Sequence, residues 1–579
     1  MMSWKSTSLK VFKKLLIPLS FFLWIFLFAK YNFAKGFDFT DSTLSYHFSL
    51  RVLNGDVPFK DFHTTPLPFS YYFGAFFHFL FGKSFLVNNY LGLFCVFVQT
   101  FLIYLILKIF IKNKIDAFII TIFLVSIFGN INGTIYFSYK PLAYTLSLLS
   151  VYLSLISLNR PNLVYQIGIT SCLTFFTLQS LGLAIISSYL FFISILFIYK
   201  IYDRKFIFSL FIKYSLGFLL ILIPFIIYYS NQGVFEEIRY IITTSAERKG
   251  LDSYSFLNFF DTLFPAHNSK TLVATVIFSI SYIFCLLRLS NKNLLYLYLF
   301  ASVFAIIGFY NGGTIKQISN IIFYESPKIL ILFTLFYYIF YKRSKLSESN
   351  LLITIMLGGL IFVYELGWPG KGYKLPVLAS IIFFLIPYFK MGITSQSRKI
   401  NSFFTFKLFF VLSNIFLLIW NLFNPVRKVY RDFEPDNKIT INPYLKERKI
   451  SSKHKIAINY FKQNYSKYCS SQNTFIFPWA PILYEIIGTK NSTKYDMPNH
   501  DWITLKESKK VISSLKKNPP CYLILEKSAV YNKGRFVFPA KGLKEIAKFL
   551  KDEFLVDYEY ISDVNTFATN WIIFYKKQQ

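Results

Sequence analysis

Long apolar runs separated by short polar segments occupy the chain as far as residue 424. A run of about 17 to 25 apolar residues is long enough to cross a bilayer as an α-helix. The runs predict about thirteen spans and therefore a polytopic α-helical membrane protein. We expect the spans near 15–33, 86–110, 115–129, 139–158, 163–178, 180–199, 206–229, 271–289, 293–310, 328–341, 350–366, 374–390 and 403–424.

Residues 426–579 do not continue this pattern, and their composition is that of a globular domain. The segments NTFIFPW, YLILEK and NWIIFYKK predict β-strands, because they are short and rich in β-branched and aromatic residues. The segments KHKIAINYFKQNY and KGLKEIAKFLKDEF have helical apolar spacing. We therefore expect a membrane domain over 1–425 and a mixed α/β domain over 426–579.

Basic residues predict the orientation of these spans. Alternate loops place the following residues on the same side as the basic N-terminus: Lys112, Lys114, Arg160, Arg204, Lys205, Arg288, Lys292, Lys342, Arg343, Lys345, Arg398 and Lys399. Short loops rich in Lys and Arg remain in the cytoplasm. An odd number of spans then places the loops 35–84 and 230–270, and the domain 426–579, on the extracytoplasmic face of the inner (cytoplasmic) membrane.

The composition supports a membrane protein, since 54% of the residues are hydrophobic and only 16% are charged. A soluble protein has about 25% charged residues. A net charge of +33 would suggest nucleic acid as the partner of a soluble chain, but here the charges lie in loops between spans and in the C-terminal domain. We therefore expect membrane lipids, and no nucleic acid, as partners.

Two of the five cysteines, Cys469 and Cys521, lie in the C-terminal domain, whereas the others fall within apolar spans. The two can form a disulfide if the domain is exported. The sequence contains neither a CxxC nor an HExxH motif. We therefore expect no metal and no other cofactor.

The loop 35–84 is rich in carboxylates in a chain with few acidic residues. They are Asp38, Asp41, Asp56 and Asp61. Leu44, Phe48 and Val52 have helical spacing, which predicts a short helix on the membrane surface that starts at Asp41. A carboxylate at that position has two interpretations: it caps the helix N-terminus, or it acts as a general base at the edge of the bilayer. The residues alone leave both open.

The same loop continues with NGDVPFKDFH, from Asn54 to His63, and then with the aromatic run PLPFSYYFGAFFHFLFG. The aromatic run predicts an interfacial or re-entrant segment over 66–81. The order of these features resembles that of the GT-C glycosyltransferases of bacteria. It consists of a first span, then an acidic residue that starts an interfacial helix, and then this motif. The GT-C glycosyltransferases are integral membrane enzymes related to protein O-mannosyltransferases and to the aminoarabinose transferases of lipid A.

Three later segments extend the resemblance over nearly the whole chain. TLQSLG, at 177–182, is similar to a Lys-Gln-x-x-Gly turn of such enzymes, although Leu178 stands where a lysine is common. EEIRYIITTSAERKG, at 236–250, resembles their second large external loop. FIFPWAPILYEIIGTKNSTKY, at 475–495, resembles a segment of their exported domain.

The resemblance implies an inverting enzyme that transfers a sugar from a polyprenyl-phosphate donor to a lipid, glycan or protein acceptor. Asp41 matches the position of the proposed catalytic base of this class, and Asp38 is the alternative. One base suffices for inversion. The leaving phosphate needs cations, for which the candidates are Arg248, Lys249, Lys371 and Lys374.

Other candidate substrate-binding residues are Asp61, His63, Tyr484 and Tyr495, with Glu485 beside them. Each has a competing structural interpretation: loop geometry for Asp61 and His63, and ordinary burial with a bonded hydroxyl for the tyrosines.

Two other function classes compete with a GT-C glycosyltransferase. A polymerase or ligase of the O-antigen type is also multispanning, but it usually has its main catalytic loop late in the chain and lacks a C-terminal α/β domain. A transporter or flippase of lipid-linked sugars predicts an internal repeat and charged residues at mid-membrane. The sequence shows no such repeat and few such charges.

Overall fold

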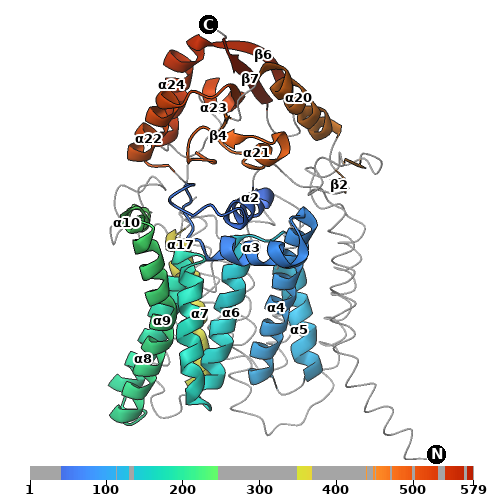
Figure 1. Ribbon diagram of the computed structural model, residues 1–579. Helices are drawn as coiled ribbons and strands as arrows, with labels where there is room; N and C mark the ends of the chain where they lie inside the picture. The colour runs from blue at the N-terminus through green and yellow to red at the C-terminus, as the bar shows by residue number, and fades with distance from the viewer. Residues whose placement is uncertain are drawn as a thin grey trace, which may run out of the picture.

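The computed structural model describes residues 41–111, 114–128, 136–244, 348–367, 438–439, 448–449, 452–469, 473–498, 503–531, 541–565 and 570–577. The described chain forms three layers: a bundle of membrane helices, a layer of short helices across one end of it, and a C-terminal α/β region beyond that layer (Figure 1).

The bundle is built from apolar helices. They are α4 (Phe85–Phe110), α5 (Lys114–Phe128), α6 (Tyr139–Ser157), α7 (Val164–Phe175), α8 (Gln179–Ile198), α9 (Arg204–Asn231) and α17 (Glu348–Gly367), with a short 3-10 turn, η2 (Pro161–Leu163), before α7. Within the described residues, α4, α8 and α9 are long and apolar enough to cross a membrane. The other four helices coincide with predicted spans, whereas the remaining predicted spans and the boundary at 425–426 lie outside the described residues, so the count of thirteen stays a prediction.

Glycines allow the helices of this bundle to approach closely. A Cβ atom on Gly168 of α7 would collide with the backbone of Tyr214 in α9, and one on Gly217 of α9 would collide with the carbonyl of Tyr165 in α7. Small residues at helix crossings are the usual means by which membrane helices gain van der Waals contact. The two glycines therefore fix the α7–α9 crossing.

The middle layer consists of α2 (Asp41–Leu53), α3 (Phe69–Phe81) and α10 (Phe235–Thr243). The helix predicted to start at Asp41 is present as α2, and its position on the membrane surface stays a prediction. The aromatic segment predicted to be interfacial or re-entrant forms α3, which lies across the ends of the membrane helices beside α2 (Figure 1). Gly74 of α3 lets that helix pack tightly on Ser49 of α2.

The C-terminal region contains a five-stranded mixed sheet in the order β4-β3-β5-β7-β6. Its strands are β3 (Asn473–Phe477), β4 (Lys490–Asn491), β5 (Tyr522–Glu526), β6 (Tyr558–Asn565) and β7 (Asn570–Lys576). β3 runs parallel to β4 and β5, with Ile476 opposite Ile524, whereas β7 is antiparallel to β5 and β6. A separate two-residue pairing joins β1 (Lys438–Ile439) to β2 (Arg448–Lys449).

Helices surround this sheet. They are α20 (Ser452–Tyr468), α21 (Ile482–Ile487), α22 (Leu505–Lys517), α23 (Lys527–Tyr531) and α24 (Lys541–Phe549), which continues into a π-helical turn (Leu550–Phe554) and a 3-10 turn (Leu555–Asp557). The three predicted strands and the two predicted helices are confirmed. α22 and the edge strand β6 were not predicted, because both are rich in polar residues.

A disulfide joins Cys469, which follows α20, to Cys521, which precedes β5. The possible pairing inferred from the sequence is thus present in the structure.

Candidate active site

The helix α2 has two faces with different roles. Phe48 stacks on Phe62 with ring centroids 4.8 Å apart and lies 5.1 Å from the ring of Tyr71 in α3. His47 and Arg51 are four residues apart and therefore neighbours on the helix surface. Their side chains reach the C-terminal region. α2 consequently connects the apolar packing of the middle layer to a polar contact with the C-terminal region.

The polar contact is a largely buried group of charged side chains, which we call the junction cluster: His47, Arg51, Asp56, Glu485 and Asp496. Asp496 lies at its centre, with Oδ2 3.0 Å from His47 Nε2 and 2.5 Å from Arg51 Nη1. The other ring nitrogen of His47 lies 3.2 Å from Glu485 Oε1. Arg51 Nε lies 2.6 Å from Asp56 Oδ2. Every member therefore has a partner of opposite charge when His47 is protonated.

Further hydrogen bonds and a ring contact hold the two central members in place. Asn491 Nδ2 donates to the second carboxylate oxygen of Asp496 at 2.9 Å. The Arg51 guanidinium donates to the carbonyl oxygen of Asp61 at 3.1 Å and lies 4.9 Å from the Phe62 ring centroid. These contacts satisfy the donors and acceptors that burial withdraws from water, which a buried charge requires.

The electrostatics of the cluster favour its charged form. Burial alone would raise the pKa of Asp496, but the charge of Arg51 and the hydrogen bond from His47 hold that pKa far below its usual value. Burial alone would lower the pKa of His47, but its hydrogen bonds to Asp496 and Glu485 together raise that pKa above 6.5. We conclude that Asp496 is ionised at neutral pH, with His47 biased toward its cationic form.

A second set of contacts lies beside the junction cluster. Lys494 Nζ lies 2.6 Å from Glu237 Oε1 of α10 and donates to the carbonyl oxygen of Phe59 at 3.1 Å. The backbone N–H of His63 donates to the carbonyl oxygen of Lys494 at 2.7 Å. Residues 494–496 are thus held by two segments, the one after α2 and the one after α9.

His63 and Glu507 extend these contacts to α22. Both side chains are buried, and His63 Nε2 lies 3.7 Å from Glu507 Oε1. Glu507 also completes a capping box with Thr504, which begins α22. The Thr504 hydroxyl is in turn 3.0 Å from the Tyr240 hydroxyl of α10. The N-terminus of α22 is therefore held by His63, from the segment after α2, and by Tyr240 of α10.

The turn TLQSLG connects the same layer to the bundle. Gln179, the first residue of α8, donates from Nε2 to the carbonyl oxygen of Thr65 at 2.9 Å. A Cβ atom on Gly182 would collide with the backbone of Phe175 in α7. Two residues of this motif therefore have structural roles: Gln179 ties α8 to the first loop, and Gly182 allows the tight turn between α7 and α8.

Only some of the predicted site residues fall within the described part of the chain. Asp41 is the first residue of α2, but its side chain lies outside the described part. The remaining predicted residues that lie outside it are Asp38, Arg248, Lys249, Lys371 and Lys374.

The other predicted residues lie around the junction cluster. Asp61 is exposed, and its Oδ2 accepts a hydrogen bond from the backbone N–H of Val57 at 2.7 Å. His63 is buried with its ring centroid 4.7 Å from that of Tyr495. Tyr484 is buried, and its hydroxyl accepts a hydrogen bond from the backbone N–H of Ile476 at 3.0 Å. Each of these contacts gives a structural role to the residue that makes it.

Five residues of this region had no predicted role: His47, Arg51, Asp496, Lys494 and Glu507. The i, i+4 spacing of His47 and Arg51 on α2 was a usable signal. Asp496 carried none, because its partners come from a segment far away in the chain.

Among the side chains that the structure describes, no group of three or more His, Cys, Asp and Glu residues is arranged to hold a metal ion.

Comparison with known proteins gives a structural match but no sequence match. No protein-family model and no curated protein matches the chain. The fold is similar to that of the oligosaccharyltransferase of Archaeoglobus fulgidus in its complex with Zn and sulfate, with a TM-score of 0.50 and 12% identity. The match covers 95% of this chain and 72% of that one.

A second structure of that enzyme, tethered by a disulfide to an acceptor peptide that contains the NVT sequon, gives a TM-score of 0.42 and 12% identity over 97% of this chain and 74% of that one. At this identity the first match shows the fold. The chain therefore has a fold similar to that of this oligosaccharyltransferase.

Proposed function

We propose that this membrane protein is a glycosyltransferase that moves a sugar from a polyprenyl-phosphate donor to a lipid, glycan or protein acceptor. The reaction takes place on the extracytoplasmic face of the cytoplasmic membrane, where the C-terminal α/β domain also lies. Two observations support this proposal: the similarity of the fold to that of the oligosaccharyltransferase, and the position of α2 between the membrane helices and the C-terminal region (Figure 1).

The main support for this proposal is that α2 begins at Asp41 and is fixed along its length. Its apolar face packs on α3, and its polar face is held by the buried pairs of His47 and Arg51 with Asp496. A catalytic base must be held within a fraction of an ångström of its target, and rigid secondary structure does this better than a loop. α2 thus provides a rigid support for a carboxylate at the edge of the bilayer.

In the proposed reaction, Asp41 takes the proton from an acceptor hydroxyl or amine as that group attacks the anomeric carbon of the sugar. The bond between this carbon and the phosphate oxygen breaks, and the phosphate keeps the electron pair. The attack comes from the face opposite the leaving group, so the configuration inverts. Arg248, Lys249, Lys371 and Lys374 are the residues proposed to stabilise the charge that grows on the phosphate.

The test uses the purified full-length protein in lipid nanodiscs, supplied with a radiolabelled polyprenyl-phosphate sugar and candidate acceptors. The measured quantity is the release of polyprenyl phosphate. We expect Asp41→Asn to lower the release by about 100-fold or more, which is the usual effect of losing a general base. Asp552→Asn changes an exposed carboxylate of the C-terminal region and should leave the rate unchanged.

Full release with Asp41→Asn would exclude Asp41 as the base, and Asp38→Asn would then be tested in its place. If the wild-type protein transported the labelled lipid between leaflets without releasing polyprenyl phosphate, the protein would be a flippase and the proposed reaction would be wrong.

A further inference from the structure

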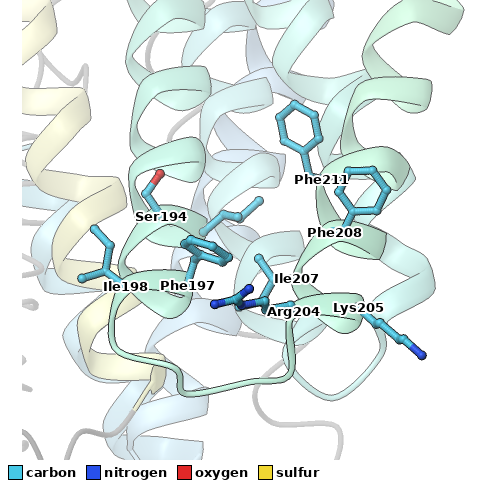
Figure 2. A pocket seen from close by; sticks show the side chains of 9 residues that line it. Ser194, Phe197, Ile198, Arg204, Lys205, Ile207, Phe208 and Phe211 are labelled. Carbon is cyan, nitrogen blue, oxygen red and sulfur yellow. The ribbon is translucent and has the colours of Figure 1, made fainter.

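The end of the bundle farthest from the C-terminal region contains a pocket of about 690 Å³. It lies between the last turns of α8 and the first turns of α9 (Figure 2). Its walls are mainly apolar side chains, among them Phe197, Ile198, Phe208 and Phe211. Arg204 and Lys205 line its mouth.

The apolar walls of this pocket are open to the surroundings. Ile198 is 68% exposed and Phe208 is 64% exposed. α8 and α9 are both long enough to cross a membrane, and only 17% of the apolar window of α9 is buried by protein. Side chains of this kind at the end of a membrane span are covered by lipid acyl chains.

The charges at the mouth select among lipids. Figure 2 shows the Arg204 side chain beside Phe197, whereas Lys205 extends away from the pocket. The Arg204 guanidinium lies 6.0 Å from the Phe197 ring centroid. In the part of the chain that the structure describes, neither basic side chain is paired with a carboxylate. A phosphate group at this mouth therefore meets the Arg204 guanidinium first, and the charge of Lys205 lies farther out.

The backbone adds to this preference. α9 is 28 residues long and begins at Arg204, so its N-terminal N–H groups and the positive end of its dipole are at the mouth of the pocket. Asp203 occupies the N-cap position, but its side chain makes no capping hydrogen bond. The backbone at this helix end thus favours an anion beside Arg204, and the Asp203 carboxylate reduces that preference.

We propose that this pocket is a binding site for an anionic phospholipid. One acyl chain lies against Phe197 and Phe208, and the headgroup phosphate lies at Arg204 and Lys205. Each basic residue near an anionic lipid surface contributes about 1 kcal/mol, which is about a fivefold factor in affinity. A zwitterionic lipid gains less, because its ammonium group is repelled by the same two cations.

This site is separate from the proposed glycosyl-transfer site. α9 has 28 residues, and at about 1.5 Å per residue its two ends are about 42 Å apart. The pocket is at the first end, and α10, which contacts the C-terminal region, follows the second. The lipid is therefore neither the sugar donor nor the acceptor.

The test measures lipid retained by the full-length protein after incorporation into vesicles of equal phosphatidylglycerol and phosphatidylcholine and purification in detergent. Native mass spectrometry counts each lipid per protein. We expect wild type to prefer phosphatidylglycerol by about 10- to 30-fold at its tightest site and the double variant Arg204→Ala, Lys205→Ala to lose this preference. The thermal unfolding midpoint of both proteins in phosphatidylcholine alone should be the same, which shows that the variant is folded.

The matched control is the double variant Lys108→Ala, Arg160→Ala. It removes one lysine and one arginine that are exposed on other helix ends of the bundle and do not line the pocket. It should keep the wild-type preference. An unchanged preference in the Arg204, Lys205 variant, or an equal loss in the control, would overturn the proposal, as would a lipid-free dimer in which a second copy of the chain covers this face.

Discussion

His47 Nε2 lies 3.0 Å from Asp496 Oδ2, although the two residues are 449 positions apart in the chain. The pair joins α2, which begins at Asp41, to the segment that follows β4. Because both side chains are nearly inaccessible to solvent, the contact holds only if the two elements stay in register. The C-terminal region is therefore part of the structure that positions α2.

Loss of the central carboxylate should destabilise the junction cluster. Asp496→Asn leaves His47 and Arg51 beside a neutral amide, and removal of one partner from a buried ion pair costs about 3 kcal/mol or more. We expect the free energy of unfolding in detergent to fall by about that amount. The exposed substitution Asp552→Asn should change it by less than about 0.5 kcal/mol. An equally small effect of Asp496→Asn would show that the cluster contributes little to stability.

The raised pKa of His47 predicts a dependence of stability on pH. The pKa of His47 is higher in the folded state than in the unfolded state, where it is near 6.5. The stability that protonated His47 contributes is therefore fully present below the unfolded-state pKa. It is lost as the pH rises through the folded-state pKa. The thermal unfolding midpoint of wild type, relative to that of His47→Gln, should therefore fall as the pH rises from about 6 toward 9.

His78 provides the control for this measurement. Burial lowers the pKa of His78 to about 4, whereas its unfolded value is near 6.5, so His78 affects the pH dependence of stability only below about pH 7.5. His78→Gln should consequently show the same pH slope as wild type between about pH 7.5 and 9, even if its midpoint is lower throughout. A wild-type slope in His47→Gln would mean that another group causes the dependence.

Close packing between α7 and α9 makes Gly168 sensitive to a single methyl group. Gly168→Ala places a Cβ atom against the backbone of Tyr214, which cannot move without shifting α9. Overpacking of this kind costs about 1–3 kcal/mol, and we expect a lower thermal unfolding midpoint in detergent. Ser187→Ala, at an exposed position of α8, should have little effect. Wild-type stability of Gly168→Ala would show that the two helices are farther apart than described.

The disulfide between Cys469 and Cys521 predicts both a stability effect and a compartment. Their sequence separation is 52 residues, and closing a loop of this size in the unfolded chain stabilises the fold by about 4 kcal/mol in the chain-entropy treatment. The double variant Cys469→Ser, Cys521→Ser should unfold at a lower temperature than wild type. Peptide mass spectrometry of protein alkylated without reductant should recover the two cysteines linked, as expected for an exported region. Free thiols at both positions in protein from intact cells would contradict this location.

Local pattern was sufficient to predict several elements correctly. The spacing of Leu44, Phe48 and Val52 predicted α2 and its start at Asp41, and short β-branched and aromatic runs predicted β3, β5 and β7. These elements are determined by neighbours within one or two turns or along one strand. β6 was missed because polar residues interrupt its apolar positions, of which only Tyr558 and Val564 are buried.

The contacts of the candidate site, in contrast, depend on residues that are far apart in the chain. The sequence by itself determined an apolar chain with membrane spans, an interfacial helix and a carboxylate at its first residue. Only the tertiary structure decided that His47 and Arg51 share Asp496, that Lys494 pairs with Glu237 and that His63 lies beside Glu507. The physical reason is that periodicity reports local burial, whereas an ion pair depends on which distant segments exclude water from the same place.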